Sequence, residues 1–568
     1  MTRAAALVMV LALGLLVRLA NSWTFSTLPV SAYQRTWTES DMETAWRWSS
    51  TILAGDVLGR DTIHPYTGWM RAMAPLATWE RWWGGRGVFH QAPLYAYTLA
   101  LMRRVGGDGF WGVALGQMAL GLASVAGVFL LAERVFGLRA ALISGLGAAL
   151  YGPFLLHETL LLRDGLAVAC SLLLLWALLR APDHGAAAWL AAGLSFAAAV
   201  LARETLALYG VFVVIWIAQR YWRQPQLRRA TLPFAVGALL GVAPLVARNL
   251  VVGVAPFALS TRALETFVHG HAAGASPVGL TLPPSTREIL ERSDGDFGTA
   301  VRLTFATWDG NASGLVAHEW AKLRALVSRY EAMDNVDWYY FADRSRVLAW
   351  SLRFEWVLAF GLVGLLASRP RVDDRPLRYF LVAAVPALLY GIMVGRYRLA
   401  PAAVLLVYAG GSVEWIGERL AAGRWRPATI ALAAVGASLV LSSVALRDVE
   451  KRHRYRDTEF MLAAATYYER GQATLAYDEL AAGLAAAYRG DDQRVLPPGW
   501  SKLLDPLLAV GHELGRDADT AALLERLAHD YPDDPEPHRR LTTVYEQALA
   551  RPADAAAHRA AEQRLRAR

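Results

Sequence analysis

The chain has 568 residues, of which 55% are hydrophobic and 19% are charged. Soluble domains hold about 45–50% apolar and about 25% charged residues, so an ordinary soluble globule is excluded, as are disordered, collagenous and coiled-coil chains. The single cysteine, Cys170, excludes an intramolecular disulfide and a cysteine-based metal site. The net charge of +8 does not indicate a nucleic-acid partner, because arginine in a polytopic membrane protein collects in cytoplasmic loops.

Long apolar runs divide the chain into membrane spans. A helix needs about 20 apolar residues to cross the hydrocarbon core, and the sequence predicts about 11 such helices, so we expect an all-α polytopic membrane protein. The first run follows Arg3 and reads as an uncleaved anchor, because Leu19–Trp23 is a poor cleavage site and many runs follow. The predicted spans are residues 4–21, 111–132, 139–156, 160–179, 186–202, 205–218, 231–247, 347–367, 378–395, 399–416 and 427–446.

The distribution of arginine orients these spans. With a cytoplasmic N-terminus, arginines such as Arg228 and Arg229 gather in the even-numbered loops, which is the positive-inside pattern. An odd number of spans then places the C-terminal part outside. We therefore predict a multi-pass protein of the cytoplasmic (inner) membrane, with a transmembrane domain at 1–446 and an extracytoplasmic helical domain at 447–568.

Two loops on the outer side are long, about 22–110 and 250–346. The first is rich in tryptophan, which suits a membrane–water interface. Its apolar piece 92–102 is too short to span, so we expect a helix lying in the interface. The second loop is rich in charge, glycine and proline and is expected to fold over the outer face.

The polar, alanine-rich tail has a helical pattern without a span. Residues 467–480 resemble the first helix pair of a tetratricopeptide repeat (TPR), and residues 515–532 resemble a second. The two are further apart than the ~34 residues of that repeat, so an insertion around 489–500 is required. An irregular bundle of α-hairpins is the alternative, and the tail is a candidate site for a protein partner.

Polar groups beside a span are candidates for function, and Asp41 in the first outer loop is one. A carboxylate at the outer mouth could act as the general base for an acceptor hydroxyl. The alternative is a helix cap, since Ser40 or Asp41 begins an amphipathic helix. Further outer polar residues are candidates for a substrate pocket: Glu43, His90, Gln91, Tyr95, His157 and Glu158. His90 and Gln91 could instead be surface residues, and Glu158 could instead pair with Arg163.

Arginines at the outer ends of spans run against the positive-inside bias. They are Arg203, Arg248, Arg396 and Arg398. Guanidinium groups bind phosphate oxygens bidentately, so a phosphate near the outer leaflet is the expected ligand, and contact with lipid headgroups is the alternative. No nucleotide-binding glycine motif and no zinc spacing occurs. The sequence indicates no definite cofactor; a divalent metal is left open, with His269 and His271 as a candidate pair.

Several short motifs occur in an order that resembles the GT-C superfamily of integral-membrane glycosyltransferases, in particular the protein O-mannosyltransferase and lipid A aminoarabinose transferase branch. The motifs are Arg18, Asp41 followed by Ala45 and Gly55-Asp56, Gln91–Tyr95, Tyr151–Phe154 with Glu158, Leu201–Arg203, Arg248-Asn249 and Arg396–Leu399. The resemblance covers about 1–446. Two departures leave the substrate class open: Met42 separates Asp41 from the next acidic residue, and Glu204 follows Arg203 where relatives often have proline.

The resemblance implies a donor with a sugar on a polyprenyl phosphate, whose chain lies in a groove between spans. It implies that Asp41 accepts the proton of a glycan, lipid or protein acceptor, that the sugar is transferred with inversion, and that Arg396, Arg398, Arg248 and Arg203 hold the phosphate. The other readings are a polysaccharide polymerase or ligase of the same fold, a transporter, and a membrane-anchored assembly factor. Chemistry requires Asp41, Arg248 and Arg396 to converge in one outer cavity.

Overall fold

The computed structural model describes residues 2–490 and 492–567, which are almost entirely helical. Within these residues, β-structure is limited to two isolated bridges. The helices form two compact units. The first comprises Met1–Ser26 and Gln34–Arg447, and the second comprises Thr27–Tyr33 and Asp448–Arg568. The prediction of an all-α protein is confirmed.

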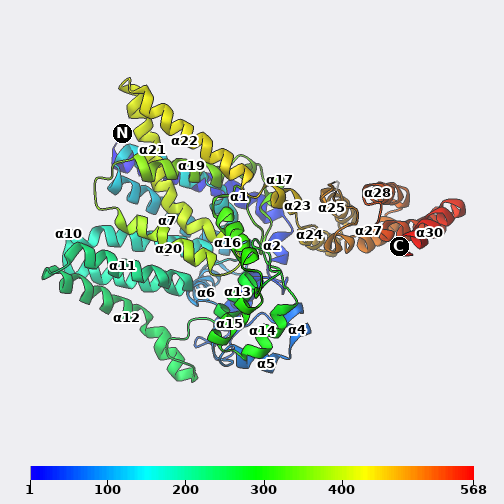
Figure 1. Cartoon of the computed structure of the whole chain (residues 1–568), viewed down its shortest axis with the longest axis horizontal. Coiled ribbons are helices and arrows are strands. Elements are labelled where there is room, and N and C mark those ends of the chain that lie inside the picture. Colours follow the sequence, from blue (N-terminus) through cyan, green and yellow to red (C-terminus); the bar gives the residue numbers. More distant parts are fainter. Residues whose placement is uncertain (1, 491, 568) are drawn as a thin grey trace. The chain divides into compact units, whose positions relative to one another are not determined.

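Six helical segments of the described residues are long and apolar enough to cross a membrane. They are α1 (Arg3–Thr27), α7 (Phe110–Val135), α10 (Asp164–Ala202), α12 (Gln226–Val252), the stretch Gly395–Ala421 that combines the short turn η2 (Gly395–Arg398) with α21 (Leu399–Ala421), and α22 (Trp425–Val444). Shorter helices occupy the other predicted runs: α8 (Leu138–Leu150), α11 (Ala207–Tyr221), α19 (Phe354–Ala367) and α20 (Arg375–Leu389). These helices lie side by side in Figure 1, and the chain is a polytopic membrane protein.

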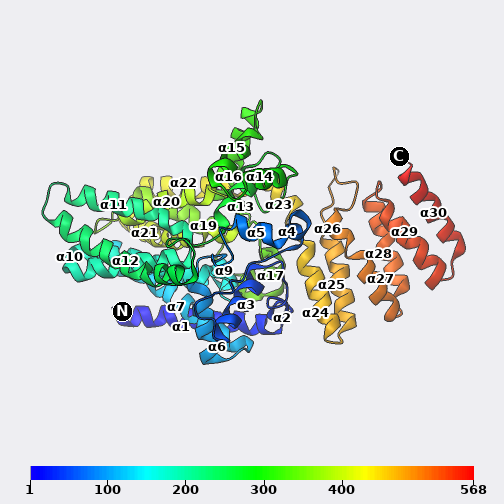
Figure 2. The ribbon, with the colours of Figure 1, turned by 90° about the horizontal axis from the view of Figure 1, so that it is seen from below.

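Helix α10 holds two of the predicted spans. Its 39 residues would measure about 58 Å if straight. Gly185, at φ 73°, breaks it into two helices by adopting a left-handed conformation that glycine tolerates. As a result the chain folds back, and Arg203, just after the last residue of α10, lies 2.7 Å from Asp164, the first residue. Figure 2 shows this turn beside α11 and α12.

The two long loops that are predicted to be outer loops form short helices that pack together. Trp79 and Trp83 of the first loop share a hydrophobic core with Val268 and Leu290 of the second. The first loop contains α3 (Asp41–Leu53), α4 (Gly68–Met73), α5 (Leu76–Trp82) and α6 (Leu94–Gly106), and the second contains α13 (Arg262–His271), α14 (Ser285–Ser293), α15 (Phe297–Ala306), α16 (Ala312–Val327) and α17 (Trp338–Arg344). Helix α6 covers most of the stretch predicted as an interfacial helix.

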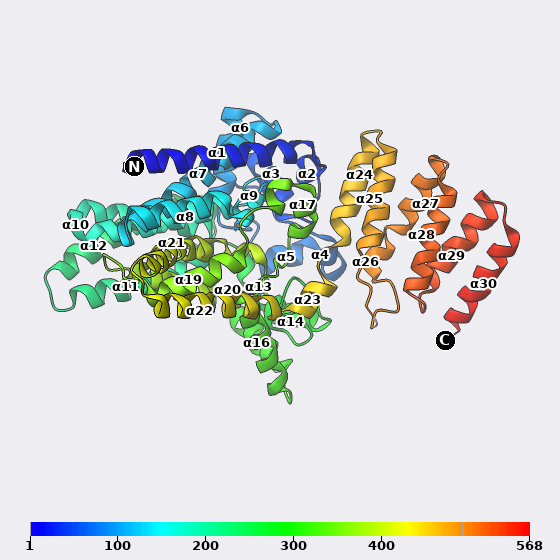
Figure 3. The ribbon, with the colours of Figure 1, turned by 90° about the horizontal axis from the view of Figure 1, so that it is seen from above.

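The second unit stacks helices in chain order (Figure 3). Its main elements are α24 (Asp457–Glu469), α25 (Ala473–Ala486), α27 (Leu504–Glu513), α28 (Asp517–Asp530), α29 (Pro535–Thr543) and α30 (Pro552–Arg566). Gly471 joins α24 to α25 and Gly515 joins α27 to α28, at φ 72° and 68°. Each hairpin therefore turns on a left-handed glycine at an equivalent place. The assignment to the tetratricopeptide class stays a prediction.

Candidate functional site

Asp41 is the first residue of α3, but it does not cap that helix. Ser40 is the cap, and its side chain accepts a hydrogen bond of 3.2 Å from the backbone nitrogen of Glu43. Because Ser40 satisfies this end of the helix, the carboxylate of Asp41 is available for other contacts.

The carboxylate of Asp41 accepts four hydrogen bonds from four distant parts of the chain. The donors are Gln91 Nε2 at 2.7 Å and Arg262 Nη1 at 3.0 Å to Oδ1, and Arg396 Nη2 at 2.6 Å and Asn335 Nδ2 at 3.0 Å to Oδ2. A carboxylate has about four lone-pair positions, so all of them are used. Burial alone would raise the pKa of Asp41, but Arg262 and Arg396 hold it well below its ordinary value.

Arg396 joins this carboxylate to two others. It lies in the irregular turn η2, where its Nη2 is 2.6 Å from Asp334 and its Nη1 is 3.4 Å from Asp164. Asp164 also binds Arg203 at 2.7 Å. Positive and negative side chains therefore alternate through one connected network. Buried charges are normally stabilised by this kind of pairing.

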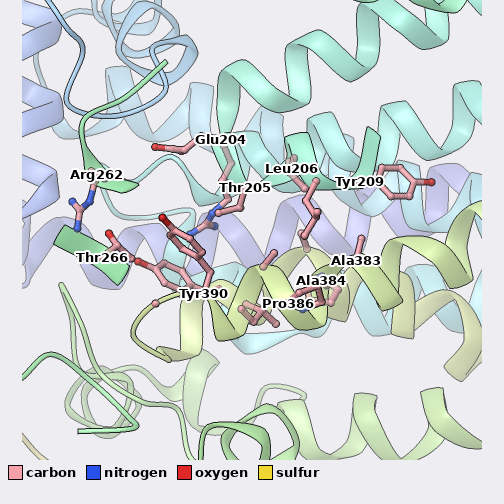
Figure 4. Close-up of a pocket in the computed structure, with 18 of the residues that line it drawn as sticks. Glu204, Thr205, Leu206, Tyr209, Arg262, Thr266, Ala383, Ala384, Pro386 and Tyr390 are labelled. Atoms are coloured by element: carbon pink, nitrogen blue, oxygen red, sulfur yellow. The ribbon is translucent and has the colours of Figure 1, made fainter. Parts of the chain in front are cut away.

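A cavity of about 500 Å³ begins at this network (Figure 4). Its polar end contains Arg163, Arg203, Glu204, Arg262 and Tyr397. Its remaining walls are mostly apolar and come largely from η1 (Glu204–Leu206), α11 and α20, including Leu206, Leu208, Phe380, Ala383, Ala384, Pro386 and Ala387. The cavity is thus amphipathic, with a charged end and a long apolar part.

A second cavity, of only about 20 Å³, is lined in part by two of the donors to Asp41. Its lining includes His157, Asp334, Asn335 and Arg396. Since Asp41 binds Arg262 of the large cavity and both Asn335 and Arg396 of the small one, its carboxylate lies between the two.

Four buried polar atoms around these cavities make no hydrogen bond within the described part of the chain: Arg163 Nε, Glu204 Oε1, Arg396 Nε and His157 Nδ1. Buried donors and acceptors are normally paired, so these atoms mark a place where a polar ligand would be stabilised.

Several predicted site residues join the network. Gln91 and Arg396 bind Asp41, Arg203 lines the large cavity, and His157 lines the small one. His90 Nε2 lies 3.3 Å from Arg262 Nη1. Burial and the charge of Arg262 hold the pKa of His90 well below its ordinary value, so this imidazole is neutral.

Arg398 and Arg248 do not join the network around Asp41. Arg398 donates to the backbone oxygens of Ser328 at 2.5 Å and Tyr330 at 2.9 Å. Arg248 donates to backbone oxygens in the first outer loop, including that of Leu58 at 2.6 Å. Of the three residues expected to converge, Asp41 and Arg396 do so and Arg248 does not, because its guanidinium is used to fasten a loop.

Glu158 also lies outside the network around Asp41. It pairs with Arg18 at 2.6 Å, whereas Arg163 pairs with Glu204 at 2.5 Å, so the alternative of a Glu158–Arg163 salt bridge is wrong. The physical reason is that α9 (Gly152–His157) turns the Glu158 side chain toward α1.

Two further pocket candidates have local partners. Glu43 lies 3.2 Å from Arg47 on the same helix, and burial raises its pKa. The hydroxyl of Tyr95 accepts a hydrogen bond of 3.0 Å from Gln117.

The histidines considered for a metal have separate partners. His269 meets the Trp69 ring edge-on at 5.1 Å between centroids, and His271 Nε2 lies 3.2 Å from Lys322 Nζ. Among the described residues, no group of three or more His, Cys, Asp or Glu is arranged to hold a metal ion.

Three residues of the site were not predicted from the sequence: Arg262, Asp334 and Asn335, all from the second outer loop. Arg262 follows the same rule as the other outer arginines but does not end a span. Asp334 and Asn335 have no spacing that relates them to Asp41, so only the fold brings them together.

Comparison with known proteins gives one family match. A family model described as dolichyl-phosphate-mannose-protein mannosyltransferase matches residues 90–247. This stretch contains Gln91, Asp164 and Arg203, and the predicted resemblance is confirmed over it. No protein of curated function matches the sequence significantly.

The solved structures that match the chain are distant in sequence. The apo oligosaccharyltransferase of Archaeoglobus fulgidus is 15% identical, with a TM-score of 0.42, over 89% of this chain and 59% of that one. ArnT from Cupriavidus metallidurans bound to undecaprenyl phosphate is 16% identical, with a TM-score of 0.42, over 92% of this chain and 80% of that one. The chain thus spans less than two thirds of the archaeal protein.

Proposed function

We propose that the chain is a membrane glycosyltransferase that moves a sugar from a polyprenyl-phosphate donor to an acceptor at the outer face of the cytoplasmic membrane, with inversion. The observation that carries the proposal is the 500 Å³ cavity, which joins an apolar passage between helices to an arginine-rich end beside Asp41. The family match over residues 90–247 supports it, because that family is described by a polyprenyl-type phosphate sugar donor and a protein acceptor.

The cavity has the polarity of such a donor. The isoprenoid chain would lie against the apolar residues of α11 and α20, and the phosphate would lie at Arg262 and Arg203. The Arg262 side chain is 30% exposed, and within the described residues its hydrogen bonds come only from Nη1. Its Nε and Nη2 are therefore available as a two-pronged donor to phosphate oxygens.

The reaction would need one proton acceptor and one stabilised leaving group. The acceptor oxygen or nitrogen forms a bond to the anomeric carbon, and the bond from that carbon to the phosphate oxygen breaks with its electron pair on the oxygen. Asp41 takes the proton of the acceptor. Arg262 and Arg203 stabilise the charge that develops on the polyprenyl phosphate.

The contacts of Asp41 in this structure indicate which of the two substrates binds first. All four lone-pair positions of its carboxylate are occupied, and two strong cations lower its basicity. A phosphate bound by Nε and Nη2 of Arg262 would offset the positive charge of that guanidinium and so raise the basicity of Asp41. Donor binding would therefore come first and would prepare the base for the acceptor.

Calorimetry in detergent tests the proposal. We expect undecaprenyl phosphate to bind and undecaprenyl alcohol, which has the same chain without the charge, to bind much more weakly. Arg262→Ala should remove most of the difference between the two lipids. Equal binding of both lipids by the unaltered protein would contradict a phosphate-binding site in the cavity.

A further inference from the structure

Helix α16 in the second outer loop has its polar and apolar faces reversed relative to a helix of a soluble domain. The apolar side chains of Val316, Trp320, Leu323 and Val327 follow a spacing of four, three and four residues and form one stripe. These residues are 69%, 60%, 36% and 38% exposed. Lys322, on the opposite face, is 0% exposed.

Hydrogen bonds fix this orientation from the inside. Lys322 Nζ donates to the backbone oxygen of Leu389 at 2.9 Å and lies 3.2 Å from His271 Nε2. His318 Nε2 lies 2.9 Å from the backbone oxygen of Gly270. Rotating the helix to bury the stripe would break these bonds and expose the polar face instead, so the stripe is held outward.

The surroundings of α16 indicate what covers the stripe. The helix packs against α20, a helix of the membrane domain whose outward side chains Val382 and Val385 are 53% and 39% exposed. Exposed apolar side chains therefore occur on both of these neighbouring helices. Trp320 with the neighbouring exposed Arg324 is the combination found where hydrocarbon meets headgroups.

The direction of the helix agrees with this position. Figure 3 shows α16 projecting from the side of the bundle, across the direction of the long helices. A helix at a membrane border lies in this way, with one face in the acyl chains and the other against protein or water.

We infer that α16 is an interfacial helix whose Val316–Val327 stripe inserts into the outer leaflet of the bilayer. Lys322 links this helix to the end of α13 and the end of α20, and both of those helices contribute walls to the 500 Å³ cavity. The bilayer thereby anchors the outer loop that carries Arg262. The inference concerns the lipid around the protein and holds whether or not the cavity takes a sugar donor.

Spin labelling of the full chain in lipid nanodiscs tests the insertion. Cys170 is buried and is the only cysteine, so Cys170→Ala supplies the background. A nitroxide is attached in the variants Val316→Cys and Trp320→Cys, and a control is attached in Glu288→Cys, at an exposed position of the same loop. Two stripe positions are labelled, so the test can still be made if one of the two variants does not fold.

Collisions with oxygen, which concentrates in lipid, are compared with collisions with a water-soluble nickel chelate. We expect a ratio of oxygen to nickel collisions at 316 and 320 that is several-fold above the ratio at 288. A ratio equal to that at 288 would show a stripe in water and would overturn the inference. Shielding from both reagents, with dipolar coupling between labels of two chains, would also overturn it, because a second copy would then cover the stripe.

Discussion

Nη2 of Arg396 lies 2.6 Å from Oδ2 of Asp41 and also 2.6 Å from Oδ2 of Asp334. One guanidinium nitrogen thus serves two carboxylates. Asp41 also contacts Arg262, which lines the large cavity, and Asp334 itself lines the small one. The two aspartates are therefore similar in their bond to Arg396 and different in the cavity that their contacts reach.

This difference makes Asp334 a matched control for Asp41. We expect Asp41→Asn to lower transfer by about 10²–10⁴-fold, the usual effect of losing a general base. Asp334→Asn removes a charge from the same arginine and should cost much less activity. Turnover with a purified lipid-linked sugar is the measurement, and near-normal turnover of Asp41→Asn would exclude it as the base.

Arginine-to-lysine changes should separate ligand binding from structural support. In Arg262→Lys, the planar fork is lost and we expect weaker binding of undecaprenyl phosphate with little change in melting temperature. In Arg398→Lys, we expect a lower melting temperature and unchanged binding, because Arg398 holds buried backbone oxygens instead of facing the cavity. The opposite pattern would assign the phosphate to Arg398.

The pH dependence of the reaction should change when the donor binds. Arg262 and Arg396 hold the pKa of Asp41 below its ordinary 3.8 despite burial, and the pKa of His90 also lies below its ordinary 6.5. In the free protein Asp41 stays charged above its ordinary pKa, so kcat/KM for the donor should show no acid limb from this group above about pH 4. A bound phosphate offsets the charge of Arg262, so the pKa of Asp41 rises in the donor complex. As the pH is lowered, kcat should therefore begin to fall at a higher pH than kcat/KM does. Identical acid limbs would mean that the donor leaves Asp41 unchanged.

The same lowered pKa affects stability in a defined direction. A carboxylate whose pKa is lower in the folded state stabilises the fold above its unfolded pKa, and this contribution is lost as the pH falls through the folded value. The Asp41 contribution should therefore persist above about pH 4 and be absent in Asp41→Asn at every pH. Melting temperatures of both proteins against pH should converge only in strong acid.

Filling the apolar part of the cavity should act on the lipid chain of the donor. Ala384 lines the cavity, whereas the next residue, Val385, is an outward-facing residue of the same helix. Ala384→Trp should raise KM for a long-chain donor more than for a short-chain analogue, and Val385→Trp should affect neither. Equal loss with both donors in Ala384→Trp would indicate disturbed folding of α20 instead of a blocked chain.

The buried pair of Arg18 and Glu158 is a structural contact that can be tested by paired substitution. Their side chains are 1% and 5% exposed. Arg18→Met leaves a buried carboxylate without its partner and should cost about 3–5 kcal/mol, whereas adding Glu158→Gln should recover much of that loss. Thermal unfolding in detergent measures both, and activity should follow stability.

Much of the membrane domain could be predicted, because the hydropathy of a segment depends only on the residues of that segment and not on long-range contacts. Each predicted span overlaps a helix, although some of these helices are shorter than the prediction and two spans belong to α10, where Gly185 provides the turn. Asp41, Gln91 and Arg396 could be found because they lie in short motifs beside spans. Arg262, Asp334 and Asn335 could not, because the loop that brings them to Asp41 is folded by long-range contacts such as that of Trp83 with Glu265, at 2.8 Å.

The pairing of Glu158 shows the same limit. Sequence proximity favours Arg163, five residues away, but the charge that Glu158 meets is Arg18, which comes from the first helix of the chain. Sequence spacing predicts partners only within one regular helix, and the chain between Glu158 and Asp164 is not helical.

The burial of Lys322 has a consequence for chemical labelling of the intact protein. The chain has three lysines, and the other two, Lys451 and Lys502, are exposed and belong to the second unit. A membrane-impermeant amine reagent applied to whole cells should therefore modify lysine only in the C-terminal unit, and only if that unit lies outside the cytoplasm. Peptide mapping of the labelled protein would thus report the side of the membrane on which the tail lies without any fusion or substitution.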